Sequence, residues 1–190
     1  MSRIVAGAAG GVPLSSVPGT GTRPTTDRVK EALFSRLEAL DVLAGARVLD
    51  LFAGSGALGV ESASRGASSA ELVEADAKAV AVCQRNAGLV NDTLGRTAVL
   101  VARSKVESFL ARTAGAGADR WTLVFLDPPY ALGEAELTAV LATLAPQLDA
   151  EAVVVVERSA RSPEPAWPAT LERFAGKKYG ETHLWFAEPA

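Results

Sequence analysis

The strongest constraint on the fold is a regular alternation of apolar β-type segments and helical segments that begins at residue 46. The strand candidates are 46–51, 70–75, 98–102, 121–126 and 152–157, and the helix candidates are 57–65, 77–91, 105–114 and 133–145. The strand candidates are almost continuously apolar, which is expected when helices cover both faces of a parallel sheet. Two further β-type runs, 171–175 and 181–187, have no helix between them and predict a terminal antiparallel hairpin. We therefore expect an α/β protein with a Rossmann-like sheet of seven strands.

The segment before this alternation predicts a small N-terminal β-hairpin extension followed by one helix. Residues 3–7 and 12–17 are short β-capable runs separated by a glycine-rich turn, and prolines mark the second run as an edge. A helix with a threonine cap is expected over 25–37, where apolar residues recur on one face. We divide the chain into a hairpin extension, residues 1–22, and a main domain, residues 23–190.

Composition excludes several classes of protein. The single cysteine, Cys83, excludes an internal disulfide and a multi-cysteine zinc site, and it is typical of a reducing, cytoplasmic setting. The single histidine, His183, is not preceded by a G-x-S-x-G motif, which disfavours a Ser-His-Asp hydrolase. No apolar run approaches the ~18 residues of a membrane span, and the N-terminus does not resemble a secretory signal. We expect a cytoplasmic monomer that has no metal site and does not bind a membrane.

The charge distribution is more informative than the net charge of −3. Residues 1–36 carry five basic and two acidic side chains, and residues 158–178 carry the same numbers, so both flanks are basic and the middle is acidic. One interpretation is ordinary solvated surface charge. The other is a pair of basic patches beside one cleft, which would attract a phosphate backbone.

A glycine-rich turn follows the first strand of the alternation and predicts a cofactor site. Gly54 to Gly59 matches G-x-G-x-x-G and opens a helix, which places bare backbone beyond the carboxyl ends of the strands. Asp50 at the strand end suits a positively charged cofactor such as S-adenosylmethionine better than the pyrophosphate of a dinucleotide. Alternatively, Asp50 only accepts a hydrogen bond from the loop backbone. Glu74, at the end of the next strand, would accept hydrogen bonds from ribose hydroxyls, although NAD would require the same group.

The motif that discriminates between these cofactors is Asp127-Pro-Pro-Tyr130, directly after the apolar strand 121–126. Two consecutive prolines remove two backbone donors, so Asp127 and Pro128 offer only acceptors to a ligand. Tyr130 adds an aromatic plane. Acceptors beside a stacking surface are what the exocyclic amine of a nucleobase requires. Positioning and charge would then direct the amine at an electrophilic methyl group.

Together, these motifs give a resemblance to a known family. Asp50–Gly56 with Asp127–Tyr130 resembles the class I S-adenosylmethionine-dependent methyltransferases that act on amino groups of bases. The upstream stretch Thr22–Phe34, with Arg3–Gly7 and Lys178–Thr182, resembles the bacterial 16S ribosomal RNA guanine-N2 methyltransferase family (RsmD type). The resemblance covers essentially the whole chain and implies methyl transfer to the N2 amine of a guanine in 16S rRNA. The implied partner is the small ribosomal subunit or its assembly intermediate.

The resemblance also implies roles for particular residues. Those expected to bind the cofactor are Arg23, Thr25, Asp50, Leu51, Phe52, Gly54, Gly56, Glu74, Ala75 and Ser104. Those expected to hold the guanine amine are Asp127, Pro128, Pro129 and Tyr130. Those expected to bind RNA are the N-terminal hairpin extension as a whole and the residues Arg3, Arg28, Lys177, Lys178 and Tyr179. One position departs from the family pattern, because Ser104 or Lys105 stands where an acidic residue usually binds the adenine amine. Backbone groups or the Ser104 hydroxyl would make that contact here.

Other functions remain open at this point. Asp-Pro-Pro-Tyr would also accept adenine N6 or cytosine N4 in DNA, although no large target-recognition domain is visible. A non-catalytic S-adenosylmethionine-binding module is a second class, but it would not need the acceptor turn. An NAD-dependent dehydrogenase is disfavoured by Asp50. Cytosine C5 methylation needs a nucleophilic cysteine, and Cys83 lies in the middle of a predicted helix.

Overall fold

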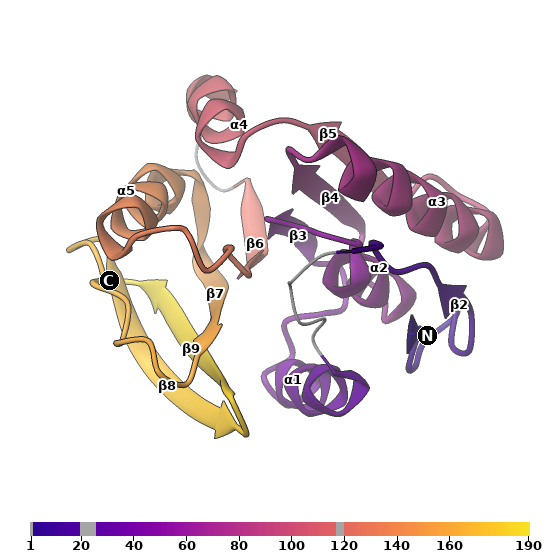
Figure 1. Cartoon of the computed structure of the whole chain (residues 1–190), viewed down its shortest axis with the longest axis horizontal. Coiled ribbons are helices and arrows are strands. Elements are labelled where there is room, and N and C mark those ends of the chain that lie inside the picture. The colour runs from indigo at the N-terminus through magenta and orange to yellow at the C-terminus, as the bar shows by residue number, and fades with distance from the viewer. Residues whose placement is uncertain (1, 20–25, 117–119) are drawn as a thin grey trace.

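The central element is a seven-stranded sheet with the strand order β5-β4-β3-β6-β7-β9-β8 (Figure 1). It is seen in a computed structural model that describes residues 2–19, 26–116 and 120–190. The strands are β3 (Arg47–Leu51), β4 (Ser69–Glu74), β5 (Val99–Arg103), β6 (Trp121–Leu126), β7 (Leu148–Ser159), β8 (Leu171–Tyr179) and β9 (Thr182–Pro189). The first five are parallel, and β9 is antiparallel to both β7 and β8. The predicted α/β fold, the seven strands and the terminal hairpin at the sheet edge are confirmed.

Helices cover both faces of this sheet. They are α1 (Asp27–Ala39), α2 (Ala57–Ser64), α3 (Ala77–Leu94), α4 (Val106–Thr113) and α5 (Glu134–Leu144), with 3-10 turns η1 (Ala114–Ala116) and η2 (Ala145–Gln147). Successive residues along each central strand enter different apolar clusters, as the period of two requires. Phe125 and Val155 pack with residues of α1, α2 and α3, whereas Leu126 and Val156 pack with residues of α4 and α5. In the part of the chain that the structure describes, no helix combines the length and apolar character needed to cross a bilayer.

Helix α1 begins as its sequence predicts. The Thr26 side chain accepts a hydrogen bond from the backbone N–H of Val29, and Asp27 places a negative charge in the first turn. The predicted apolar face is buried, and it consists of Val29, Leu33, Phe34 and Leu37. This helix therefore lies against the sheet with its polar face toward solvent.

The N-terminal hairpin is much shorter than predicted. Its strands are β1 (Ser2–Arg3) and β2 (Pro13–Leu14), in place of runs at 3–7 and 12–17. The reason is that backbone donors expected to pair across the hairpin bind helix α2 instead. The N–H groups of Val5 and Ala6 both donate to the Glu61 carboxylate, and the N–H of Ala8 donates to the carbonyl of Ser64.

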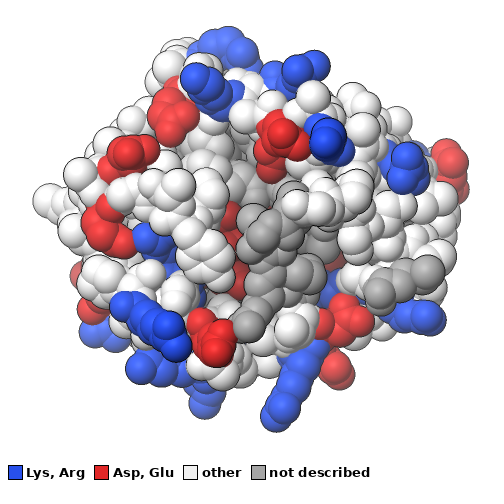
Figure 2. All heavy atoms as spheres, in the orientation of Figure 1, with Lys and Arg blue, Asp and Glu red and all other residues white. Residues whose placement is uncertain are grey.

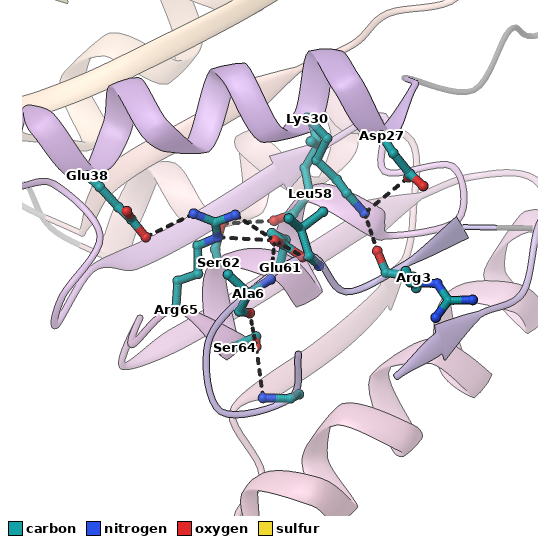
Figure 3. A network of polar contacts seen from close by, with 12 residues as sticks. Arg3, Ala6, Asp27, Lys30, Glu38, Leu58, Glu61, Ser62, Ser64 and Arg65 are labelled. Atoms are coloured by element: carbon teal, nitrogen blue, oxygen red, sulfur yellow. Dashed lines mark hydrogen bonds and ion pairs between the residues drawn. The ribbon is translucent and has the colours of Figure 1, made fainter. Parts of the chain in front are cut away.

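A buried polar network holds this N-terminal segment (Figure 3). Glu61 is fully buried, and its Oε1 lies 3.0 Å from Nη2 of Arg65, the residue that caps the C-terminal end of α2. Arg65 also pairs with Glu38 of α1 at 2.9 Å. A buried carboxylate is tolerated only when it is paired and hydrogen-bonded, and Glu61 meets both conditions through Arg65, Val5 and Ala6.

A buried lysine extends the same network. Lys30 of α1 is 1% exposed, and its Nζ donates to the carbonyl of Arg3 at 2.8 Å and lies 3.9 Å from Asp27. Burial lowers the pKa of Lys30, although Glu61 and Asp27 oppose that shift. Residues 3–6 are therefore hydrogen-bonded to side chains of both α1 and α2. The division at residues 22 and 23 lies outside the described residues.

The C-terminal strands are longer than predicted, with β7 extended at both ends and β8 continuing to Tyr179. The predicted strand 171–175 ends just before Gly176, and glycine inside a strand usually weakens it. Here Gly176 leaves room for two rings of β9. His183 and Trp185 stack with centroids 3.7 Å apart, and a Cβ at Gly176 would lie 3.0 Å from the Trp185 ring. The aromatic pair thus occupies the space over Gly176, and the pairing between β8 and β9 continues past this residue to Tyr179.

Candidate functional site

A cavity of about 1120 Å³ lies at the carboxyl edge of the parallel strands. This is where open α/β sheets bind ligands. The segments that line it include Phe52–Ser55 after β3, Glu74–Asp76 after β4, Ser104–Glu107 after β5, Asp127–Tyr130 after β6, Glu157–Ser159 at the end of β7 and Lys178–Thr182 between β8 and β9. Figure 2 shows acidic side-chain atoms near the centre of the viewed face, whereas most Lys and Arg side chains lie toward its periphery. The lining of the cavity itself includes both carboxylates and basic side chains.

The glycine loop after β3 has the backbone conformation that its sequence predicts. Gly54 and Gly56 have φ values of +59° and +80°, which favour glycine. Phe52 also has a positive φ, +58°, which is a strained conformation for a side chain of this size. At Gly59 a Cβ would lie 2.1 Å from Leu72, so the last glycine lets α2 approach the sheet closely. The loop thus presents open backbone to the cavity at Gly54, where nothing lies within 4 Å of a Cβ.

Asp50 is buried at the end of β3, and it is one of the residues that line the cavity. Its Oδ2 accepts a hydrogen bond from the Gly59 N–H at 3.1 Å, so the backbone contact considered as an alternative is present. Burial raises the pKa of Asp50 well above its usual range, and the carboxylates of Glu74 and Glu157 raise it further. A positively charged ligand in this cavity would therefore stabilise the ionised form of Asp50.

Glu74 already holds the glycine loop through hydrogen bonds. Its Oε1 accepts from the Gly54 N–H at 2.8 Å, and its Oε2 accepts from the N–H groups of Ala75 and Asp76. Because an ionised carboxylate offers about four acceptor positions, a ligand hydroxyl can still share it. Asp76 caps helix α3 by accepting from the Ala79 N–H, as expected for a residue that has a structural role.

The position that departs from the family pattern also faces the cavity. Ser104 and Lys105 both line it, at the end of β5. The Ser104 N–H donates to the Glu74 carbonyl, and its Oγ donates to the carbonyl of Lys105 at 2.9 Å. The Ser104 hydroxyl oxygen therefore keeps acceptor capacity for an amine.

The Asp127-Pro-Pro-Tyr130 turn enters the same cavity as the glycine loop, and all four residues line it. Tyr130 is 70% exposed, so its ring is accessible for stacking. Burial raises the pKa of Asp127 well above its usual range, with further contributions from Glu157 and Asp50, and Arg158 opposes the shift. The turn therefore brings a carboxyl group, a proline pair and an accessible ring into the cavity that the glycine loop also lines.

Sequence reasoning missed two cavity residues at the end of β7. Glu157 and Arg158 are the first charged residues after the apolar run Val153–Val156, and they lie within β7 at the level of the sheet that Asp127 reaches just after β6. Arg158 pairs with Glu134 of α5. The rule that singled out Asp50 and Asp127, a charged group at the end of a buried strand, could have found Glu157 as well.

The structure does not bring all predicted residues to the cavity. Leu51 is fully buried in the cluster that packs with α4 and α5, and neither Leu51 nor Gly56 lines the cavity. Arg23 and Thr25 lie outside the described residues. Of the residues predicted to bind RNA, Arg28, Lys178 and Tyr179 line the cavity, whereas Arg3 and Lys177 do not. Arg3 lies in β1, and Lys177 lies in the edge strand β8.

Comparisons with known proteins agree with the fold and with the motifs. The family model described as conserved hypothetical protein 95 matches residues 2–188. Ribosomal RNA small subunit methyltransferase D of Escherichia coli K12 is 36% identical over 179 residues, which are 94% of this chain and 85% of that protein. The Haemophilus influenzae protein of the same name is 32% identical over 85% of this chain and 80% of its own length. Among solved structures, a hypothetical protein of Thermus thermophilus matches with a TM-score of 0.80, 34% identity and 99% coverage of both chains. The family resemblance of the sequence motifs is thereby confirmed, and the chain belongs to the conserved hypothetical protein 95 family, together with the ribosomal RNA small subunit methyltransferase D proteins.

Proposed function

We propose that this protein transfers a methyl group from S-adenosylmethionine to the exocyclic N2 amine of a guanine in 16S ribosomal RNA. The observation that carries the proposal is the shared cavity of the Asp127–Tyr130 turn and the glycine loop. An amine held by the turn would face a cofactor held by the loop. The names of the relatives, ribosomal RNA small subunit methyltransferase D, support a substrate in the small subunit or its assembly intermediate. Such a substrate would place the protein in the cytoplasm.

The residues present fit a cationic nucleoside cofactor. A cavity of about 1120 Å³ slightly exceeds the roughly 300–1000 Å³ that is usual for a small-molecule site, which suits a nucleoside cofactor and a base together. Asp50, Glu74 and Asp127 surround the bare backbone at Gly54 with acceptors. These carboxylates would repel a pyrophosphate, so they argue against a dinucleotide cofactor. When bound, S-adenosylmethionine supplies an electrophilic methyl group on a positively charged sulfur.

The chain's own residues would position the amine. The Asp127 carboxylate and the carbonyl of Pro128 would accept its two hydrogens, which directs the nitrogen lone pair toward the loop. Because Pro128 and Pro129 have no N–H, no donor competes for the amine. The exposed ring of Tyr130 would stack on the base. Asp127 accepts a hydrogen bond from the amine most readily when its carboxyl group is ionised, and a cation in the cavity favours the ionised form.

Basic residues at the cavity would bind the RNA around the target base. Arg28, Lys178 and Tyr179 line the cavity, so they would contact nucleotides beside the flipped base. Arg3 and Lys177 would contact phosphates farther from the site. Phosphate contacts of this kind position the substrate without selecting its sequence.

The test is methylation of ribosomal small subunits from a strain that lacks this protein, with radiolabelled S-adenosylmethionine. We expect labelled N2-methylguanosine after nucleoside digestion. Asp127→Ala should abolish the label while cofactor binding changes less than several-fold, whereas Asp92→Ala, an exposed residue of α3, should leave both unchanged. Labelled N6-methyladenosine or N4-methylcytidine would overturn the guanine assignment, and full activity of Asp127→Ala would overturn the role of the turn.

A further inference from the structure

We propose that Glu157 selects guanine by accepting a hydrogen bond from the N1–H of the target base, while Asp127 holds the neighbouring N2 amine. The inference rests on the proposed function and adds a residue that determines base specificity. It also explains how a turn that accepts any exocyclic amine would be restricted to one base. Glu157 would touch the base, but it would take no part in breaking or forming a bond.

The two carboxylates come from adjacent strands at the same level of the sheet. Strands β6 and β7 are parallel, and Leu126 pairs with Val156, so Asp127 and Glu157 are the next residues of the same register. Neighbouring strand backbones lie about 4.8 Å apart. Both residues line the cavity.

The alternation of side chains along β7 places Glu157 on the face of the sheet that α1, α2 and α3 cover. Val155 belongs to the cluster that packs with these helices, and Glu157, two positions later in the same strand, points the same way. Asp127 lies one residue past β6, two positions after Phe125 of the same cluster. Leu184 of β9, which pairs with Glu157, lies in that cluster too. After desolvation, Glu157 is the largest influence on the raised pKa of Asp127, as expected for two carboxyl groups that face one another closely.

The acceptor pair matches the Watson–Crick edge of guanine and no other base with an exocyclic amine. Guanine presents N1–H and N2–H side by side, so it offers two adjacent donor groups. Adenine and cytosine present one amine beside a ring nitrogen that is an acceptor. Their ring nitrogen would face the Glu157 carboxylate with two lone pairs opposed and a buried acceptor unpaired. A site that hydrogen-bonds a substrate donor rejects analogues lacking that donor by far more than a purely apolar pocket does.

Two other carboxylates that line the cavity, Asp50 and Glu74, are hydrogen-bonded to the glycine loop and its helix, on the side proposed for the cofactor. Asp50 is 2% exposed and accepts from the Gly59 N–H. Glu74 accepts three backbone N–H groups at the end of β4. Glu157 also has an interaction within the chain, but a carboxylate has about four acceptor positions and can accept the base N–H in addition. Among the described residues, no group of three or more acidic, histidine or cysteine side chains could hold a metal ion, so a cation site does not compete for these carboxylates.

The test uses small subunits reconstituted with 16S rRNA that carries either guanine or 2,6-diaminopurine at the nucleotide that the wild-type protein modifies. The analogue keeps the N2 amine, but its N1 is an acceptor. We expect the wild-type protein to prefer guanine by at least ~100-fold in kcat/KM. Glu157→Gln can donate to N1 of the analogue, so its preference for guanine should fall by about 10-fold or more, chiefly through loss of activity on guanine. Glu151→Gln, on the same strand but exposed at its other end, should keep the wild-type ratio.

Several outcomes would contradict the inference. If Glu157→Gln lowers activity on both substrates equally, or on neither, Glu157 does not read N1. If it weakens binding of S-adenosylmethionine by calorimetry as much as it lowers activity, Glu157 is a cofactor residue and the inference fails. These results leave the proposed function intact when the wild-type protein forms N2-methylguanosine. Only absence of that product from the wild-type reaction would overturn the function itself, and this inference with it.

Discussion

The buried Glu61–Arg65 pair makes a quantitative prediction about how the N-terminal segment is held. Glu61→Ala would leave the Arg65 guanidinium, whose side chain is 5% exposed, with only the partly exposed Glu38 as a partner. It would also remove the acceptor of the Val5 and Ala6 N–H groups. Breaking a buried ion pair from one side costs about 3–5 kcal/mol. We expect a loss of this size in the free energy of unfolding, measured by urea denaturation.

Two companion variants separate the buried contact from the exposed one. Glu38→Ala removes a partner that is 55% exposed, so it should cost no more than about 1 kcal/mol. Glu61→Ala combined with Arg65→Ala should cost less than the sum of the single variants, since no charge is then left buried and unpaired. In amide hydrogen exchange, the N–H groups of Val5 and Ala6 should lose protection in Glu61→Ala. Equal costs for the Glu61 and Glu38 variants, or strictly additive costs in the double variant, would refute this reasoning.

Other perturbations test the site, the sheet and the surface. Glu74→Ala should weaken S-adenosylmethionine binding by about 10- to 100-fold in calorimetry, because buried hydrogen bonds are lost, and an unaltered dissociation constant would count against this. Gly176→Ala should lower the free energy of unfolding in urea by about 1–3 kcal/mol, since the added Cβ would lie 3.0 Å from the Trp185 ring. Gly88→Ala in helix α3, where an added Cβ meets nothing within 4 Å, should raise it by about 0.5–1 kcal/mol. The reverse order of the two effects would exclude the proposed packing. The raised pKa of Asp50 does not affect the free energy of unfolding below the unfolded pKa of about 3.8. As the pH rises from there through the folded pKa, the shift lowers the free energy of unfolding. Asp50→Asn should therefore remove this decline, so that the variant gains stability relative to the wild type as the pH rises above about 3.8, and a constant difference between the two profiles would contradict the shift. Lys177→Glu should weaken RNA binding and reduce its salt dependence, and an unchanged slope would make Lys177 ordinary surface charge.

The positions of the first five strands of the sheet and their parallel direction could be predicted because burial on both faces leaves a continuous apolar signal in each strand. Asp50 and Asp127 could be predicted for the same reason, since each is a charged group where such a signal ends. Glu157 is also a charged residue at the end of an apolar run, but no recognisable motif such as the proline pair after Asp127 follows it. Its place in the site depends on the pairing of β7 beside β6, which no local pattern encodes.

Glu61 could not be predicted because nothing local marks it as buried. A glutamate four residues before an arginine usually indicates an exposed helical ion pair. Here the partners that make burial tolerable are backbone N–H groups more than 50 residues away in the sequence. The same contacts explain why the N-terminal strands are short, since Val5 and Ala6 donate to Glu61 rather than across the hairpin.

Helix α2 has a geometric consequence for substrate choice. It begins directly after Gly56 of the glycine loop, and the carbonyl of its last residue, Ser64, accepts the N–H of Ala8 in the N-terminal segment. With eight residues at 1.5 Å each, it spans about 12 Å. If the N-terminal hairpin binds RNA, the length of α2 sets the distance between the bound nucleotides and the base that can reach the methyl group. Selection among guanines would then follow from distance along the folded RNA as well as from base chemistry.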